Sequence, residues 1–170
     1  MAVTQFNLAQ GQRAERKLLI TVAEWSEGSN STVREILGTR TEDSSIDYNP
    51  DIETTTDILG NNYTDLNKTQ PQQDFDPYLV LGGSKLGAFL NDIRRRNALS
   101  ELNQFTVYII TAFVGTTGEY QAEKHTDCSI IFNSIGGDVN VNFPISVYFS
   151  NKITTGTVDK LADDFVFTPD

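Results

Sequence analysis

Residues 39–78 constrain the fold more than any other part of this sequence. The forty-residue stretch carries nine apolar side chains and nine carboxylates, against two basic residues, Arg40 and Lys68. Seven units of the formal net charge of −10 therefore fall in less than a quarter of the chain. A segment of this composition cannot bury enough apolar surface to offset the entropy lost on ordering, so disorder is the ordinary expectation.

The order of residues in this stretch nevertheless predicts paired strands. Ile46 and Tyr48 alternate with Asp47, which predicts a short strand with the two apolar side chains turned to the core. Residues 53–57 are rich in β-branched threonine, and a Gly-Asn-Asn turn signal then leads into a second alternating run over 63–68. A polar ribbon with strand chemistry indicates that water and neighbouring copies of the chain complete its surroundings.

The rest of the chain reads as further strands and one helix. Strand patterns occupy residues 17–25, 32–37, 104–113, 119–135 and 139–149, and Pro144 in the last of these predicts an edge position or a bulge. The helix is predicted over about 84–97, with Ser84 as its N-cap. Its apolar stripe at 3.6-residue spacing consists of Leu86, Phe89, Leu90 and Ile93.

Length and composition favour one domain over 1–170, in which residues 1–16 form a flexible N-terminal arm. A single cysteine, Cys128, excludes an intramolecular disulfide framework and fits a protein assembled inside a cell. The first residues lack the apolar region of a signal peptide, and no apolar run approaches the length of a membrane span. The acidic balance argues against a reader of nucleic-acid sequence, which needs a basic surface.

No motif in the sequence predicts an enzyme, a metal site or a cofactor. His125 and Cys128 form H-x-x-C, but no second cysteine or histidine exists to complete a zinc site. The G-x-S-x-G nucleophile motif is absent, and LGGSKLG lacks the spacing of a phosphate-binding loop. Carboxylates are so abundant that any chosen pair carries little information about glycoside hydrolysis.

The stretch ILGTRTEDSSIDYNPDIETTTDILGNNYTDLNKTQPQQDFDPY, followed by LGGSKLGAFLNDIRRRN, resembles the major tail (tail tube) proteins of bacteriophages. The resemblance runs from about Lys17 to the C-terminus and is most specific between Leu37 and Gly83. It implies a mainly β subunit, an antiparallel β-sandwich or barrel with one flanking helix at about 84–97 and a long polar hairpin region at about 39–78. Such subunits form six-membered rings that stack into a hollow tube.

The same resemblance implies where the protein acts and with what. It implies a structural virion protein of the tail, assembled in the host bacterial cytoplasm. Its expected partners are further copies of itself, the tape measure, tail tip and tail terminator proteins, and double-stranded DNA that passes without sequence-specific binding.

Two sets of side chains are candidates for roles in such a tube. A wall of carboxylates repels the DNA backbone, which carries about one charge per 1.7 Å of axis, and lets the DNA slide. The candidate lumen-facing residues are Asp47, Glu53, Thr55 and Asp57. The candidate intersubunit contacts are the basic residues Arg13, Arg16, Lys17, Arg94, Arg95 and Arg96, for which a solvated helix face or a disordered arm is the alternative.

Other functions remain open at this point. The tube could belong to a non-contractile tail, which we favour, or be the inner tube of a contractile tail or an injection particle. From a different class, a soluble β-sandwich module could bind a carbohydrate or a protein. A carboxylate-dependent hydrolase is a third option, and no motif supports it. Concentration-dependent polymerisation separates the tube from the other two classes.

Overall fold

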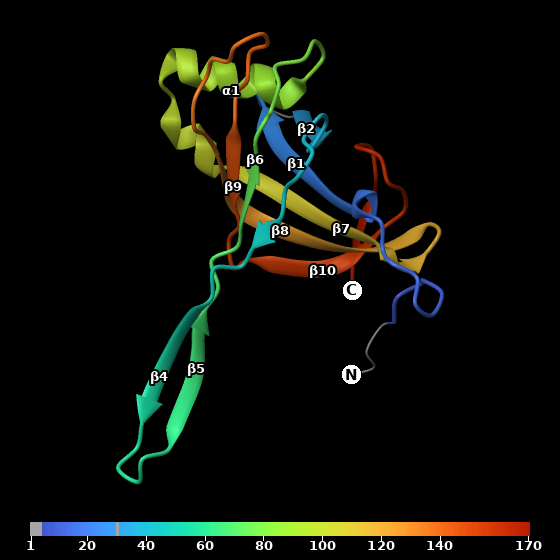
Figure 1. Cartoon of the computed structure of the whole chain (residues 1–170). Helices are drawn as coiled ribbons and strands as arrows, with labels where there is room; N and C mark the ends of the chain where they lie inside the picture. The colour runs from blue at the N-terminus through green and yellow to red at the C-terminus, as the bar shows by residue number, and fades with distance from the viewer. Residues whose placement is uncertain (1–4, 30) are drawn as a thin grey trace.

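The computed structural model describes residues 5–29 and 31–170 of the chain. One antiparallel sheet system forms the body, and a two-stranded hairpin projects from it (Figure 1). The strands are β1 (Leu19–Glu27), β2 (Ser31–Ile36), β3 (Ile46–Asp47), β4 (Asp51–Thr56), β5 (Asn62–Lys68), β6 (Gln72–Phe75), β7 (Phe105–Thr116), β8 (Glu119–Phe132), β9 (Ile145–Tyr148), β10 (Ile153–Val158) and β11 (Phe167–Pro169). The helices are α1 (Lys85–Arg96) and the short 3₁₀ turns η1 (Arg16–Leu18) and η2 (Leu99–Asn103).

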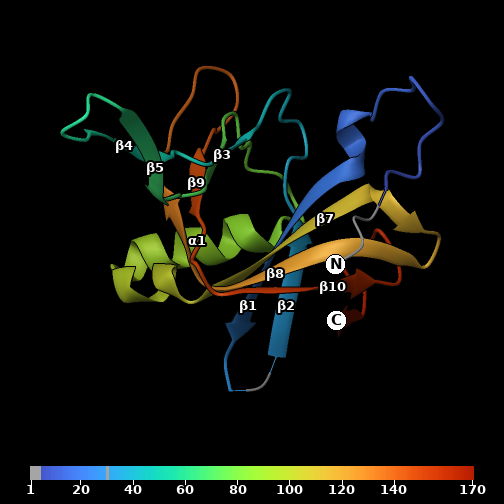
Figure 2. The same ribbon diagram turned by 90° about the horizontal axis from the view of Figure 1, so that it is seen from below.

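The long strand β8 joins two parts of the sheet. Its residues 119–128 pair with β7, and within that stretch 120–125 also pair with β10 on the other side. Its last residues, 129–132, pair instead with β9. The change of partner coincides with Asp127, whose φ of 56° breaks the extended backbone. The strand order is therefore β2-β1-β7-β8-β9-β6-β3, with β10 paired to β8 and β11 paired to β10. Figure 2 shows β7, β8 and β10 side by side.

Apolar side chains cover both faces of the central strands, as expected for strands buried on two sides. On one face, α1 closes the larger core, where Phe89 of the helix stacks on Trp25 at 5.7 Å between ring centroids. On the other face, the C-terminal segment brings Phe165 against Tyr108, with ring centroids 4.9 Å apart. The mainly antiparallel β fold with one flanking helix is thus the fold that the sequence predicts.

The structure confirms the predicted helix and corrects the strand predicted over 139–149. The helix prediction is confirmed, because α1 spans Lys85–Arg96 and the Ser84 side chain accepts a hydrogen bond from the Gly87 N–H. The strand expected to begin at Val139 is wrong over its first half. Regular pairing starts only at Ile145, and residues 137–144 form an irregular loop. Pro144 has no N–H to donate and Gly136-Gly137 turns the chain, so residues 137–144 do not pair with a partner strand.

Candidate assembly surfaces

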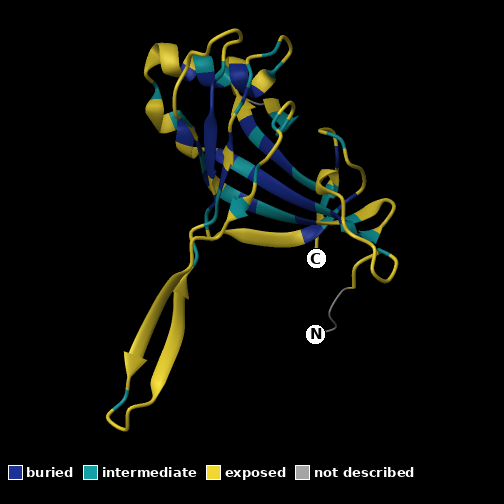
Figure 3. Cartoon of the chain, in the orientation of Figure 1, coloured by how far each residue is buried: buried dark blue, intermediate teal, exposed yellow. Residues whose placement is uncertain are grey.

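The hairpin β4–β5 extends away from the body and buries almost nothing within one copy. Every residue of both strands is exposed, and Figure 3 shows both strands in the exposed colour along their whole length. The prediction of paired strands within residues 39–78 is therefore confirmed. The two hairpin strands bury none of their side chains in one copy, whereas Phe75 and Tyr78, near the end of the region, belong to the core. A two-stranded ribbon of this kind is marginally stable alone in water.

The two faces of the hairpin differ in chemistry. The first face aligns Ile52 with Leu66 and Thr54 with Thr64 across the strands, and exposes the aliphatic pair by 57% and 61%. The second face places Glu53 directly opposite Asp65, and it continues through Thr55. Like charges directly opposite each other destabilise an isolated ribbon. The arrangement is thus costly for a single copy and gives the hairpin one apolar and one acidic side.

Asp57 organises the turn at the end of the hairpin. Its carboxylate accepts hydrogen bonds from the backbone N–H groups of Leu59 at 2.8 Å and Asn61 at 2.9 Å. It also accepts from the Asn61 side-chain amide and the Tyr63 hydroxyl, each at 3.0 Å. These bonds, those from Asn61 foremost, lower the pKa of the Asp57 carboxyl to about 2. The contact with Tyr63, which pairs with Thr55, places Asp57 on the acidic face.

The structure places the remaining candidate lumen residue, Asp47, on a separate strand. Asp47 is exposed in β3 at the end of the sheet order, whereas Ile46 packs against the core. The expectation that Tyr48 also turns inward is wrong, because 56% of Tyr48 is exposed. The strand ends at Asp47, and Asn49 then takes a positive φ of 43°, so the alternation does not continue through Tyr48.

The predicted N-terminal arm contains both exposed and anchored residues. Residues 1–4 lie outside the described residues. The Asn7 N–H donates to the Phe113 carbonyl at 3.0 Å, which attaches this segment to β7. Arg13 is exposed. Lys17 forms an exposed ion pair with Glu15 at 2.7 Å, an interaction of small energetic value at a surface.

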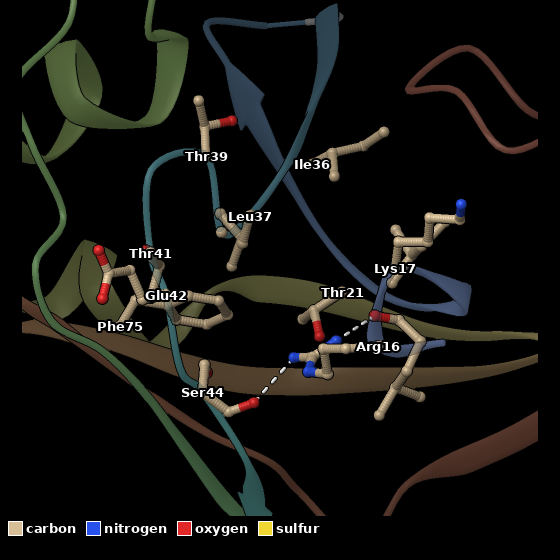
Figure 4. Close-up of a pocket in the computed structure, with 13 residues that line it drawn as sticks. Arg16, Lys17, Thr21, Ile36, Leu37, Thr39, Thr41, Glu42, Ser44 and Phe75 are labelled. Carbon is tan, nitrogen blue, oxygen red and sulfur yellow. Dashed lines mark hydrogen bonds between the residues drawn. The ribbon is translucent and has the colours of Figure 1, made fainter. Parts of the chain in front are cut away.

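Arg16 links the body to the segment that leads into the hairpin. Its guanidinium donates to the Leu19 carbonyl at 2.5 Å and to the Ser44 carbonyl at 2.8 Å (Figure 4). It lines a cavity of about 420 Å³ with Thr21, Leu37 and Phe75. The polar lining consists of hydroxyls, the basic pair Arg16 and Lys17, and one carboxylate, so it offers no nucleophile activated by a histidine.

The three arginines at the end of α1 have different surroundings. Arg96 pairs with Asp92 at 2.7 Å and with Glu101 at 2.9 Å. These hydrogen bonds, those with Glu101 foremost, raise the pKa of the Arg96 guanidinium above its usual value. Arg94 donates to the Asn91 side chain at 2.9 Å, and Arg95 is exposed. All three lie in the last turn, where positive charge favourably meets the negative end of the helix dipole.

His125 and Cys128 contribute to the core of the fold. The Cys128 thiol donates to the His125 carbonyl at 3.5 Å, and the His125 ring packs edge-on against Phe149 at 5.0 Å. Burial raises the pKa of the Cys128 thiol, which disfavours the reactive thiolate. Among the residues that the structure describes, no group of three or more His, Cys, Asp or Glu side chains could hold a metal ion. Nor does any helix in the described ranges have the length and apolar character to cross a membrane.

One important polar residue was missed in the sequence. Glu35 of β2 caps α1, because its carboxylate accepts from the backbone N–H groups of Lys85 at 2.5 Å and Leu86 at 2.9 Å. It also accepts from the hydroxyls of Ser84 at 3.0 Å and Tyr78 at 3.2 Å. The separation of about fifty residues leaves no local signal of this contact in the chain.

The fold is similar to that of two phage-like particle components of known structure. A chain of the anti-feeding prophage cap, described as the AFP tube terminating cap, matches with a TM-score of 0.52 and 16% identity over 92% of this chain and 99% of that chain. A chain of the anti-feeding prophage baseplate matches with a TM-score of 0.51 and 9% identity over 87% and 97%. No protein-family model and no curated protein matches the sequence. At these identities the likeness concerns the fold, and it spans nearly the whole chain.

Proposed function

We propose that the chain is a structural, non-catalytic subunit of a phage-like tail, and that its copies form six-membered rings that stack into a hollow tube. The observation that carries this proposal is the hairpin β4–β5, which is ordered as paired strands although every residue of its two strands is exposed in one copy. Its apolar face, with Ile52 beside Leu66, and its repulsive acidic face suit a ribbon held between other subunits on one side and water on the other.

The fold likeness supports a role in a tail particle. The similar proteins belong to structures of a tube terminating cap and a baseplate of the anti-feeding prophage. The likeness covers 99% and 97% of those chains. The expected setting is the virion tail, assembled in the host cytoplasm with tape measure, tail tip and terminator proteins.

The acidic face suits the inner wall of a tube that conducts DNA during ejection. Glu53, Asp57 and Asp65 would present carboxylates to the lumen, with Asp47 at the base of the hairpin. Double-stranded DNA carries about one negative charge per 1.7 Å, and every phosphate neutralised by a basic wall would add affinity. An acidic, hydrated wall avoids this trapping. A tube map in which these carboxylates point to the outer surface would contradict the assignment.

A second candidate role is supported by the match to the cap. The chain could end a tube, as the tube terminating cap does in its own particle, and not extend it. A terminator binds one end of a preformed tube and leaves its length unchanged, whereas a tube subunit lengthens it. Adding purified protein to short tail tubes and measuring their length by electron microscopy distinguishes the two roles.

Sedimentation velocity over a concentration series tests the main proposal. The wild-type chain is expected to shift from monomers to species of six or more copies, alone or on addition of tail-tip proteins. The matched control replaces residues 51–68 by a short Gly-Ser linker, which removes no residue of either core. This variant is expected to remain monomeric at every concentration. If it assembles as well as the wild type, the hairpin does not carry the function.

A further inference from the structure

Two apolar sites lie at opposite ends of the molecule. The hairpin turn presents Ile58 and Leu59, which are 102% and 80% exposed. The other site is formed by the loops that follow β6 and β8, at the end where α1 lies (Figure 1). Four exposed aliphatic residues lie on these two loops, with 46–88% exposure: Val80, Ile135, Val139 and Val141. Single exposed apolar residues are common, but clusters of them mark contact surfaces.

Backbone contacts hold the second site together. The Val80 N–H donates to the Val141 carbonyl at 2.9 Å, which joins the two loops. Asn142 fixes the joint further, because its side chain accepts from the Tyr78 N–H and donates to Asp76, both at 2.9 Å. Asp138 is the only charged residue in 133–144, and 79–84 contain none. We call these four aliphatic residues the loop patch.

The hairpin turn is equally well defined. The four hydrogen bonds accepted by Asp57 hold the backbone that carries Ile58 and Leu59. An ordered turn loses little conformational entropy when it docks, and this favours binding. The turn therefore presents two aliphatic side chains on a preorganised support, with no apolar surface of its own copy to cover them.

We propose that the hairpin turn of one copy docks on the loop patch of a second copy, head to tail. This inference rests on the proposed tube function and names the surfaces that would hold successive rings together. Because the two sites differ and lie at opposite ends of the molecule, the contact is heterologous and repeats without closing. Two side chains per contact would hold a single pair of copies weakly, and a ring makes several such contacts at once.

Charge complementarity also favours a second copy as the occupant. Residues 51–68 carry four carboxylates and one lysine, a net charge of −3. The helix α1, at the end of the molecule that carries the loop patch, contains four basic residues and one acid, a net charge of +3. A turn seated on the loop patch brings the acidic ribbon toward this helix. Attraction of this sign favours the encounter of two copies, and the carboxylates of the acidic face stay turned to water.

Two complementary variants test the contact. Ile58→Ser with Leu59→Ser removes the docking turn, and Val139→Ser with Val141→Ser removes the receptor. All four residues are exposed, so the fold is expected to survive, which circular dichroism checks. Val166→Ser is the matched control, since Val166 is 62% exposed on the C-terminal segment. Each double variant is expected to raise the critical concentration for tubes by roughly tenfold or more, and Val166→Ser to leave it unchanged.

Mixing the two double variants gives the sharper result. Each retains the half that the other lacks, so an equal mixture is expected to form stacks of two rings that grow no further. Negative-stain microscopy and sedimentation would detect this species, which neither variant forms alone. If both variants and the mixture form long tubes like the wild type, the docking inference is wrong while the tube function stands.

A wild-type chain that forms no tubes under any condition would count against the proposed function, and the contact can still be measured. The turn-deficient variant is labelled with ¹⁵N and mixed at millimolar concentration with the unlabelled patch-deficient variant. Chemical-shift changes confined to residues 79–81 and 135–142 support the docking. Changes elsewhere, or none, overturn it.

Discussion

Replacing Glu35 is predicted to destabilise the attachment of α1 to the sheet. Its carboxylate serves two first-turn N–H groups and two hydroxyls, with donor–acceptor distances of 2.5–3.2 Å. A hydrogen bond to a charged group contributes roughly 1.5–3 kcal/mol, and an N-terminal cap about 1 kcal/mol. Glu35 is partly exposed, so water can reach some of the orphaned donors. We therefore expect Glu35→Ala to cost about 2–3 kcal/mol in the free energy of unfolding.

Urea unfolding followed by tryptophan fluorescence measures this loss directly. Trp25 is the only tryptophan in the chain and stacks on Phe89 of α1, so its emission reports the docked helix. At roughly 2–4 °C per kcal/mol for a chain of this size, the midpoint of thermal unfolding should fall by about 4–12 °C. Glu35→Gln keeps an acceptor oxygen and should lose about half as much.

Glu119→Ala is the control for removing a carboxylate, because Glu119 is exposed at the start of β8. It should change the free energy of unfolding by less than about 0.5 kcal/mol. A Glu35→Ala protein as stable as this control would refute the reasoning that one side chain from β2 fixes the helix start.

Three further predictions concern the hairpin and the second core. The pKa of the Asp57 carboxyl is lowered from 3.8 to about 2. The stabilisation that the ionised carboxylate gives the turn is therefore complete above pH 3.8 and is lost as the pH falls through about 2. NMR titration of Asp57 measures this pKa. Asp65→Lys replaces repulsion opposite Glu53 by attraction and should slow amide exchange in the free hairpin, by about 0.2–1 kcal/mol; unchanged or faster exchange would contradict this. The Arg34 guanidinium donates to the Phe165 carbonyl at 2.6 Å and lies over the Phe165 ring. Arg34→Ala should therefore lower the free energy of unfolding in urea by about 2 kcal/mol. A loss below about 0.5 kcal/mol would show that Arg34 does not hold the C-terminal segment.

Local patterns predicted the elements whose cause is local. The stripe Leu86, Leu90 and Ile93 is fully buried, and Ser84 starts the helix as its chemistry indicates. The hairpin was predicted from threonine-rich alternation around a glycine turn, and its paired carboxylates follow from the register. In these cases the interactions that determine the helix or the hairpin are made between residues close together in the sequence.

Features that depend on tertiary contact were missed. Glu35 caps the N-terminus of α1 although it lies fifty residues earlier in the chain, and the periodicity of a sequence does not predict a helix cap that comes from another strand. The alternation of Val139 and Val141 predicts a strand, but these residues lie in a loop that pairs with no strand, and both side chains are exposed. The same error concealed the loop patch, which exists only because two loops meet through Val80 and Val141.

The basic candidates show a similar limit. Sequence reasoning grouped Arg94, Arg95 and Arg96 as one possible contact, whereas the structure pairs Arg96 with two carboxylates of its own copy. Arg16 likewise donates to two carbonyls of its own chain. A run of like residues predicts a shared face only where each side chain has the same neighbours. Whether any of them contacts another subunit stays a prediction.

Negative-stain electron microscopy of the purified chain over a concentration series tests the central claim most directly. The account predicts six-membered rings or hollow tubes, formed by the chain alone or on tail-tip proteins, with a lumen wide enough for double-stranded DNA. Compact single particles at every concentration, both with and without those partners, would contradict it and favour a soluble binding module.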